Sequence, residues 1–191
     1  MSEYQYYEFR AIDRPLEAAA QKALRALSTR ARITAHSFVN TYSYGDFKGD
    51  PRRLMEQWFD LHVYWANWGT RTLMLRAPRR FLDPETVRPY FVEHGLEAWT
   101  AGEFTILHIE RNPEESPFEY LDDDASLGPP LIPLRAELLR GDRRCLYLGW
   151  LLTVQDGLID DDTPEPPRPP GLGQLSGPLE SFTEFFGLDP D

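Results

Sequence analysis

Two runs of three aspartates are the residues of this chain best suited to binding chemistry. They are Asp122, Asp123 and Asp124, and Asp160, Asp161 and Asp162. Clustered carboxylates bind Ca²⁺ or Mg²⁺ when a loop converges their oxygens on one point. Neither run has the spaced D-x-[DN]-x-[DN]-G pattern with a distant Glu, and successive side chains of an extended segment point in different directions. We therefore expect solvated acidic loops that contact a partner, and no bound metal.

Arginines form two groups along the chain. The first group contains Arg71, Arg76, Arg79 and Arg80, and the second contains Arg135, Arg140, Arg143 and Arg144. Arginine binds phosphate through bidentate hydrogen bonds, so two groups on one face of the protein would contact a nucleic-acid backbone. The acidic segments that flank both groups in the sequence favour internal neutralisation, or competition with a partner, over constitutive binding of nucleic acid.

The net charge of −11 is unevenly distributed. Residues 1–110 carry fourteen acidic and fourteen basic side chains, so this part is neutral. Residues 111–128 carry six acidic side chains and one Arg, residues 156–172 carry five and one, and residues 173–191 carry four with no base. Charge of this kind governs solubility and the choice of partners rather than the fold.

No pattern of a known catalytic site is found in the sequence. The four histidines, His36, His62, His94 and His108, lack H-E-x-x-H and other metal-ligand spacings, and one cysteine cannot build a thiolate zinc site. The run GDFKGDP before a helix lacks the phosphate-loop pattern G-x-x-x-x-G-K-[ST] and suits a turn with a helix cap. We predict no catalytic residue, no metal ligand and no cofactor, although distant residues can converge in the fold.

The sequence also favours a cytoplasmic protein without a membrane partner. The segment MSEYQYYEFR has neither the basic nor the apolar region of a secretory signal. No stretch approaches the roughly 18 apolar residues that are needed to span a bilayer. Cys145, in the apolar run CLYLGWLLTV, has no partner for a disulfide within the chain and fits a reducing compartment as a small buried side chain.

Hydrophobic periodicity predicts alternating strands and helices. Strands are expected at 4–12, 31–44, 70–75, 96–100 and 104–110, and helices at 16–27, 51–68, 83–92, 134–140 and 143–155. Asp13 and Asp50 are the expected caps of the first two helices, and Pro51 suits the first position of the second. The apolar content of residues 51–68 predicts a largely buried helix.

These elements predict an α+β fold. We expect a mixed, mainly antiparallel sheet of about five strands, packed helices and a C-terminal helical pair. Residues 1–157 would form the globular domain, and residues 158–173 an acidic, Pro-rich connector of polyproline type. Residues 174–191 would form a C-terminal helical segment, whose Leu179, Phe182 and Phe186 either dock back on the body or serve a missing continuation.

Several segments resemble a family of uncharacterised bacterial proteins, mainly from GC-rich genomes. The resemblance rests on YQYYEFRAIDRPL (4–16), FVNTYSYGDFKGDPRRLMEQWFD (38–60), ANWGTRTLMLRAPRRFLDPET (66–86), LIPLRAELLRGDRRCLYLGWLLTVQDG (131–157) and PPRPPGLG (166–173). It carries over no activity, cofactor or catalytic residue. Members of this family are longer, so the resemblance implies a short member or an N-terminal fragment whose last helix has lost its cover.

These observations favour a non-enzymatic protein-interaction or scaffold module. Its partner would be another protein or a C-terminal continuation of the chain. One alternative is an accessory nucleic-acid-binding module in which acidic loops mask the arginines, and another is a metal-dependent hydrolase or nuclease built on convergent carboxylates. The expected partner-binding residues are Asp122, Asp123, Asp124, Asp160, Asp161, Asp162, Arg76, Arg79, Arg80, Arg143 and Arg144.

Overall fold

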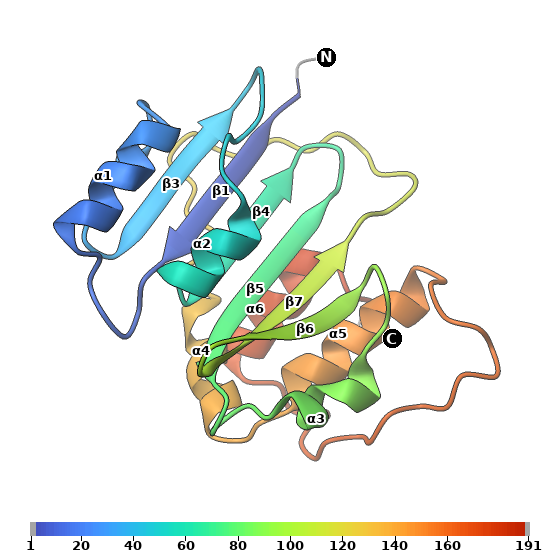
Figure 1. Ribbon diagram of the computed structural model, residues 1–191. Helices are drawn as coiled ribbons and strands as arrows, with labels where there is room; N and C mark the ends of the chain where they lie inside the picture. Colours follow the sequence, from blue (N-terminus) through green and yellow to red (C-terminus); the bar gives the residue numbers. More distant parts are fainter. Residues whose placement is uncertain (1–2, 190–191) are drawn as a thin grey trace.

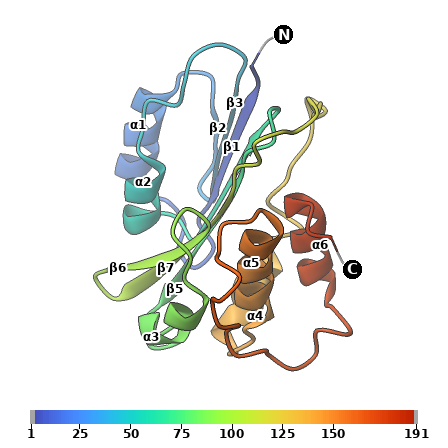
Figure 2. The ribbon, with the colours of Figure 1, turned by 90° about the vertical axis from the view of Figure 1, so that its right-hand side faces the viewer.

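The computed structural model describes residues 3–189 and shows an α+β fold with one antiparallel sheet between two helical layers (Figures 1 and 2). The strands are β1 (Gln5–Arg10), β2 (Arg32–Ile33), β3 (Ser37–Tyr42), β4 (Leu61–Ala66), β5 (Arg71–Pro78), β6 (Leu96–Ala101) and β7 (Phe104–Arg111). The helices are α1 (Ala18–Leu27), α2 (Pro51–Gln57), α3 (Pro84–Val87), α4 (Ile132–Leu139), α5 (Arg144–Gln155) and α6 (Gly177–Phe186). A 3₁₀ turn at Arg88–Tyr90 follows α3.

The seven strands have the order β2-β3-β1-β4-β5-β7-β6, and every neighbouring pair is antiparallel. The α+β fold class is therefore confirmed, whereas the expectation of a mixed sheet of about five strands is wrong. One additional strand arises because the expected strand 31–44 is divided into β2 and β3. The other is β4, which replaces part of an expected helix.

The prediction of a helix over residues 51–68 is correct for the first two turns and wrong for the rest. Asp50 does cap α2, with its side chain accepting a hydrogen bond from the amide of Arg52 at 3.0 Å, but the helix ends at Gln57. Residues 61–66 form the central strand β4, which is covered by helices on both faces of the sheet. A strand that is buried on both faces has a continuous apolar sequence, and hydrophobic periodicity alone does not distinguish it from a buried helix.

The expected cap of α1 is also wrong. This helix begins after Glu17, and no side chain caps its first amides. Asp13 lies earlier in the turn between β1 and α1, where its carboxylate pairs with Arg135 of α4. A partner that is distant in sequence has therefore taken the residue that local capping rules would assign to the helix.

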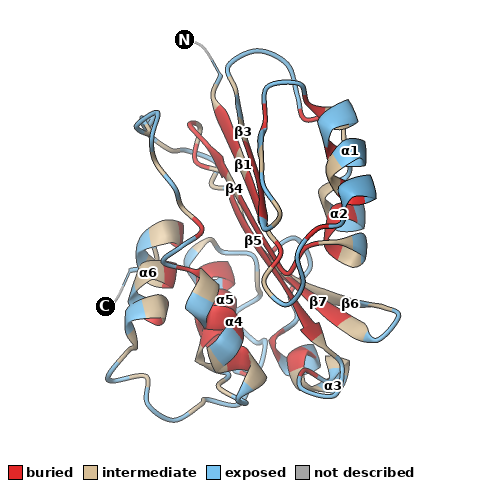
Figure 3. Ribbon diagram, turned by 90° about the vertical axis from the view of Figure 1, so that its left-hand side faces the viewer, coloured by how far each residue is buried: buried red, intermediate tan, exposed pale blue. Residues whose placement is uncertain are grey.

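Each face of the sheet forms its own hydrophobic core, because successive strand residues point to opposite faces. Against α1 and α2 lie Phe9, Phe38, Met74 and Ile106, whereas Leu61, Val63, Leu73, Leu75, Leu107 and Ile109 lie against the C-terminal helices. Figure 3 shows the two buried layers on either side of the sheet.

The C-terminal layer contains three helices. Helices α4 and α5 lie at the two expected positions, and α6 packs against both of them. Leu179, Phe182 and Phe186 of α6 are buried in the same core, so the apolar face of this helix has its cover within the chain. The last two residues of the expected segment 174–191 lie outside the described residues. None of the described helices is both long enough and apolar enough to span a membrane.

His62 is a core residue of β4 on the α2 side of the sheet. Its ring stacks on the Phe9 ring with 4.0 Å between the centroids, and its Nδ1 hydrogen-bonds to the carbonyl oxygen of Glu8 at 3.0 Å. Burial lowers the pKa of His62 from 6.5 to about 3, because a charged imidazole loses its hydration there. The neutral ring therefore packs as an aromatic side chain.

We expect His62→Gln to reduce the pH dependence of stability. In the unfolded chain His62 titrates near 6.5, and in the fold near 3, so the unfolded state alone takes up this proton as the pH falls below neutrality. The free energy of unfolding should therefore fall by about 2 kcal/mol between about pH 7 and pH 5 through this residue alone. Urea unfolding of both proteins measures this difference. Parallel pH curves would contradict it, since the other histidines are common to both proteins.

Candidate binding sites

The two aspartate runs lie in separate exposed loops. Asp122–Asp124 belong to the loop between β7 and α4, and Asp160–Asp162 to the connection between α5 and α6. Both connections run on the α4–α6 side of the sheet (Figures 1 and 2). Within residues 3–189 there is no group of three His, Cys, Asp or Glu side chains that could hold a metal ion.

The first arginine group is divided between the two ends of β5. Arg71, at its start, pairs with Glu119 at 2.7 Å and lies over the Trp65 ring. Arg76, near its end, is buried against Asp60. Arg79 and Arg80 follow the strand and are exposed, and no ion pair to either is found in the described part of the chain.

The second arginine group is divided in the same way. Arg135 is buried and pairs with Asp13, whereas Arg144 pairs with Asp142 at 2.7 Å. Arg143 is exposed and lines a different pocket from Arg79 and Arg80. Four of these arginines, Arg71, Arg76, Arg135 and Arg144, therefore form ion pairs within the chain, as the favoured interpretation of internal neutralisation predicts, and the exposed arginines lie at separate places.

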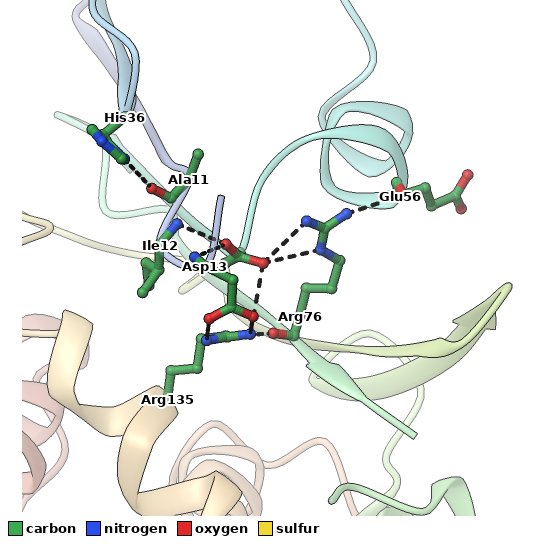
Figure 4. Close-up of polar contacts among 8 residues, drawn as sticks. Ala11, Ile12, Asp13, His36, Glu56, Arg76 and Arg135 are labelled. Atoms are coloured by element: carbon green, nitrogen blue, oxygen red, sulfur yellow. Dashed lines mark hydrogen bonds and ion pairs between the residues drawn. The ribbon is translucent and has the colours of Figure 1, made fainter. Parts of the chain in front are cut away.

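A buried carboxylate, Asp60, organises the edge of the sheet at which β1 and β5 both end. It lies among Ile12, Asp13, Arg76 and Arg135, which are labelled in Figure 4. Its Oδ2 accepts hydrogen bonds from the amides of Ile12 and Asp13 at 2.7 and 3.0 Å. Its Oδ1 accepts from Nε and Nη2 of Arg76 at 3.2 and 3.0 Å. Four donors therefore compensate this carboxylate for the loss of water.

Arg135 joins this network from the other side of the sheet. From α4 it donates through Nε to the carbonyl oxygen of Arg76 at 2.6 Å and through both Nη atoms to the carboxylate of Asp13 at 2.8 and 2.6 Å. Its Nη2 lies 3.7 Å from Oδ1 of Asp60. The bidentate pair fixes α4 against the turn that precedes α1. We refer to Asp13, Asp60, Arg76 and Arg135 as the Asp60 network.

A pocket of about 1100 Å³ opens beside this network. The turn before α1, the end of α2, the end of β5 and the β6–β7 turn form its walls. Asp60 and Arg76 belong to its lining, as do the exposed Arg79 and Arg80. We refer to it as the Arg76 pocket. The sequence groups Arg76, Arg79 and Arg80, but it does not reveal the other walls of the pocket, because residues 13–20, 57–60 and 102–104 are far from these arginines in the chain.

A second pocket, of about 570 Å³, lies where the Pro-rich connector crosses the start of α5. The Tyr90 hydroxyl donates to the carbonyl oxygen of Pro167 at 2.7 Å, and Nη1 of Arg144 donates to that of Gly171 at 3.1 Å. Polyproline backbone has no internal hydrogen bonds, so its carbonyl groups are available to such donors. The connector is therefore held on the protein surface by side chains.

The loop between β7 and α4, residues 112–131, is anchored near both ends. Glu119 binds Arg71 through its carboxylate and donates its amide to the carbonyl oxygen of Asn67 at 3.2 Å. The Gly128 amide donates to Oε2 of Glu8 at 2.7 Å. Between these anchors the aspartate run and Tyr120 are exposed, and Phe118, directly before Glu119, is exposed as well; Phe118 and Tyr120 have 44% and 91% of their surface exposed.

Glu8 is the buried anchor beneath this loop. Its side chain is fully buried, and it accepts hydrogen bonds from the Tyr6 hydroxyl and from Nε of Arg10, each at 2.7 Å, besides the Gly128 amide. Burial and the neighbouring Glu8 carboxylate raise the pKa of Tyr6 above its usual range. Sequence analysis did not identify Glu8, because a single acidic residue within a strand carries no signal of a loop that closes over it.

The described residues contain no catalytic arrangement of a nucleophile and a base. Burial raises the pKa of the Cys145 thiol to about 12, so this thiol is not activated. His62 is a neutral core residue, and His36 bonds through Nδ1 to the carbonyl oxygen of Ala11. His108 lies between Glu97 and Glu110, and no hydroxyl or thiol is bonded to any histidine ring in this part of the chain.

Comparison with known proteins gives no match: no family model fits the chain, and no curated protein or solved structure is significantly similar to it. The fold therefore defines the class, an α+β protein with one antiparallel sheet between two helical layers.

We expect Asp60→Asn to destabilise the protein strongly. Asparagine keeps the size of the side chain but removes the charge that compensates Arg76 and Arg135, and unpairing a buried ion typically costs about 3 to 5 kcal/mol. Urea unfolding measures the loss. Asp161→Asn, which removes an exposed charge, is the control and should change the free energy of unfolding by less than about 0.5 kcal/mol. Equal stabilities of the two variants would contradict the structural role of the network.

We expect Gly128→Ala to weaken the anchor of the β7–α4 loop. A methyl group at this position would overlap the carboxylate of Glu8, which the hydrogen bonds from Tyr6 and Arg10 hold in place. Such overpacking costs about 1 to 3 kcal/mol. Gly173→Ala, where a methyl group meets nothing within 4 Å, is the matched control. Thermal unfolding of both variants measures the effect, and an unchanged melting temperature for Gly128→Ala would show that the loop is not held there.

Proposed function

We propose that this protein is a non-enzymatic interaction module whose β7–α4 loop binds a basic surface of another protein. The observation that carries the proposal is the combination of an anchored loop and exposed aromatic side chains. The loop is fixed through Glu119 and Gly128 to the sheet, yet it exposes Phe118 and Tyr120 beside Asp122–Asp124.

The anchoring supports binding because it reduces the entropy that the loop loses when a partner orders it. The carboxylate of Glu119 and the amide of Gly128 hold Tyr120 and Asp122–Asp124 between two fixed points, and Phe118 is next to the first of these points. An unanchored acidic tail would pay the full ordering cost on binding. The loop therefore has the properties of a partly preorganised binding segment.

The composition of the loop supports a basic partner. Exposed aromatic side chains are enriched at protein interfaces, and tyrosine is prominent among the residues that dominate binding energy. The six acidic residues of segment 111–128 accelerate association with a positive surface and determine its orientation. A partner with basic residues around an apolar recess, which would receive Tyr120, fits both features.

The alternatives have less support. Arg76 and Arg144, two of the arginines expected to contact a nucleic-acid backbone, already pair with Asp60 and Asp142. A hydrolase or nuclease would need convergent carboxylates, and the two aspartate runs lie in separate loops. The interaction module remains the function that the described contacts favour.

We expect the loop to determine partner capture from a lysate of the native host. Two variants test it: Phe118→Ser with Tyr120→Ser, and Asp122, Asp123 and Asp124 all changed to Asn. Both should lose the protein that the unaltered chain captures, and higher salt should weaken its capture because salt screens exposed charges. Mass spectrometry of the captured proteins measures the result.

The matched control changes Asp160, Asp161 and Asp162 to Asn, which alters the net charge by the same amount in the other acidic loop. This control should retain the captured protein, and circular dichroism should show that all three variants are folded. Capture that is unchanged by both loop variants would overturn the proposal. Equal losses from the loop variants and the control would show an effect of net charge instead.

A further inference from the structure

We propose that the Arg76 pocket binds a small organic anion, with a phosphate or carboxylate group at the arginines and a planar apolar body against Trp58 and Phe104. This inference concerns a second site, because the pocket lies on the α1 and α2 side of the sheet and the β7–α4 loop on the other. Its volume of about 1100 Å³ is comparable to that of small-molecule sites.

The charges around the pocket favour an anion. Two of its acidic residues, Asp13 and Asp60, pair with Arg135 and Arg76 respectively, so the Asp60 network is neutral. Five charged residues of the lining remain: Arg14, Arg79, Arg80, Glu17 and Glu103. Among the described residues no ion pair to any of these five is found. A protein of net charge −11 thus has a pocket with unpaired arginines and a local positive excess.

Arg76 provides a fixed donor in the lining of this pocket. A guanidinium group has five N–H donors, and three hydrogen bonds of Arg76 are made, two to Asp60 and one to the carbonyl oxygen of Glu56. Two donors remain. The side chain is only 10% exposed and lies 4.4 Å from the centroid of the Phe104 ring, so its position is determined before any ligand arrives. Such preorganisation strengthens binding of an anion.

The start of α1 adds to the positive electrostatic potential in the pocket. No side chain caps its first turn, and Glu17, Ala19 and Ala20 line the pocket. The first amides of a helix lack intrahelical acceptors, and the helix dipole favours negative charge near them. This helix start acts together with the arginines and would not define a site without them.

Aromatic residues indicate the rest of the ligand. Trp58 and Phe104 both line the pocket and are half-buried. One face of the Phe104 ring lies against the Arg76 guanidinium, and the rest of this ring, together with the Trp58 ring, suits a flat apolar group, because stacked or edge-on arrangements of rings are favourable. A ligand with one acidic group on a planar body would use both parts of the lining.

Isothermal titration at low salt with three probes tests the site: 1-naphthyl phosphate, 1-naphthoate and the neutral 1-naphthalenemethanol. The expected result is binding of at least one of the two anions and none of the neutral probe. Binding of the phosphate alone, or of the carboxylate alone, assigns the acidic group of the ligand. Failure of both anions to bind in the millimolar range would overturn the proposal.

Variants locate the binding. Arg79→Gln with Arg80→Gln should weaken binding of the anion at least tenfold, and these exposed residues can change without disturbing the Asp60 network. The matched control, Arg140→Gln with Arg143→Gln, removes two exposed arginines elsewhere and should stay within twofold of the unaltered protein. Equal weakening by the two pairs would show unspecific attraction and would reject the site. Neither pair alters the β7–α4 loop, so this result is independent of partner capture.

Discussion

The burial of Asp60 is the constraint on which the arrangement of the molecule depends. A carboxylate at this depth requires donors from several directions, and here they come from the turn after β1, from β5 and, at longer range, from α4. The hydrogen bonds and ion pairs of the Asp60 carboxylate therefore fix the positions of the end of β1, the end of β5 and the start of the C-terminal layer. The Arg76 pocket exists because these segments meet around the same carboxylate.

Local sequence rules predicted what depends on neighbours in the chain. The cap at Asp50, the strands β6 and β7, and the apolar face of α6 are all determined within a few residues. Local sequence rules failed for residues whose surroundings are formed by segments that are distant in the chain. β4 was assigned to a helix because its two covered faces remove the alternation that identifies a strand. Asp13 was assigned to a helix cap, since its partner Arg135 lies far along the chain.

The candidate sites also combine features that residue type predicts with features that depend on distant segments of the chain. The exposed aspartates and the arginines after β5 were recognisable by residue type, and the structure places them on opposite sides of the sheet. The acidic segments neutralise only selected arginines: Glu119 pairs with Arg71, whereas Arg79 and Arg80 lie in a pocket away from both aspartate runs. Masking of the positive residues by acidic residues is therefore local. Glu8 anchors the β7–α4 loop, and Asp60 holds together the segments around the Arg76 pocket. Neither residue belongs to a sequence pattern that predicts such a role.

The strand order has a consequence for how the protein folds during its synthesis on the ribosome. All seven strands and helices α1, α2 and α3 precede Asn112, whereas α4, α5 and α6, which together with Val87 of α3 cover the other face, begin at Ile132. Because β1 pairs with β4, the centre of the sheet cannot close before Ala66 has emerged. Domains generally fold as units during synthesis, so the second face of the sheet is fully covered only after α4, α5 and α6 have been synthesised. Arg135 of α4 then pairs with Asp13 and completes the Asp60 network.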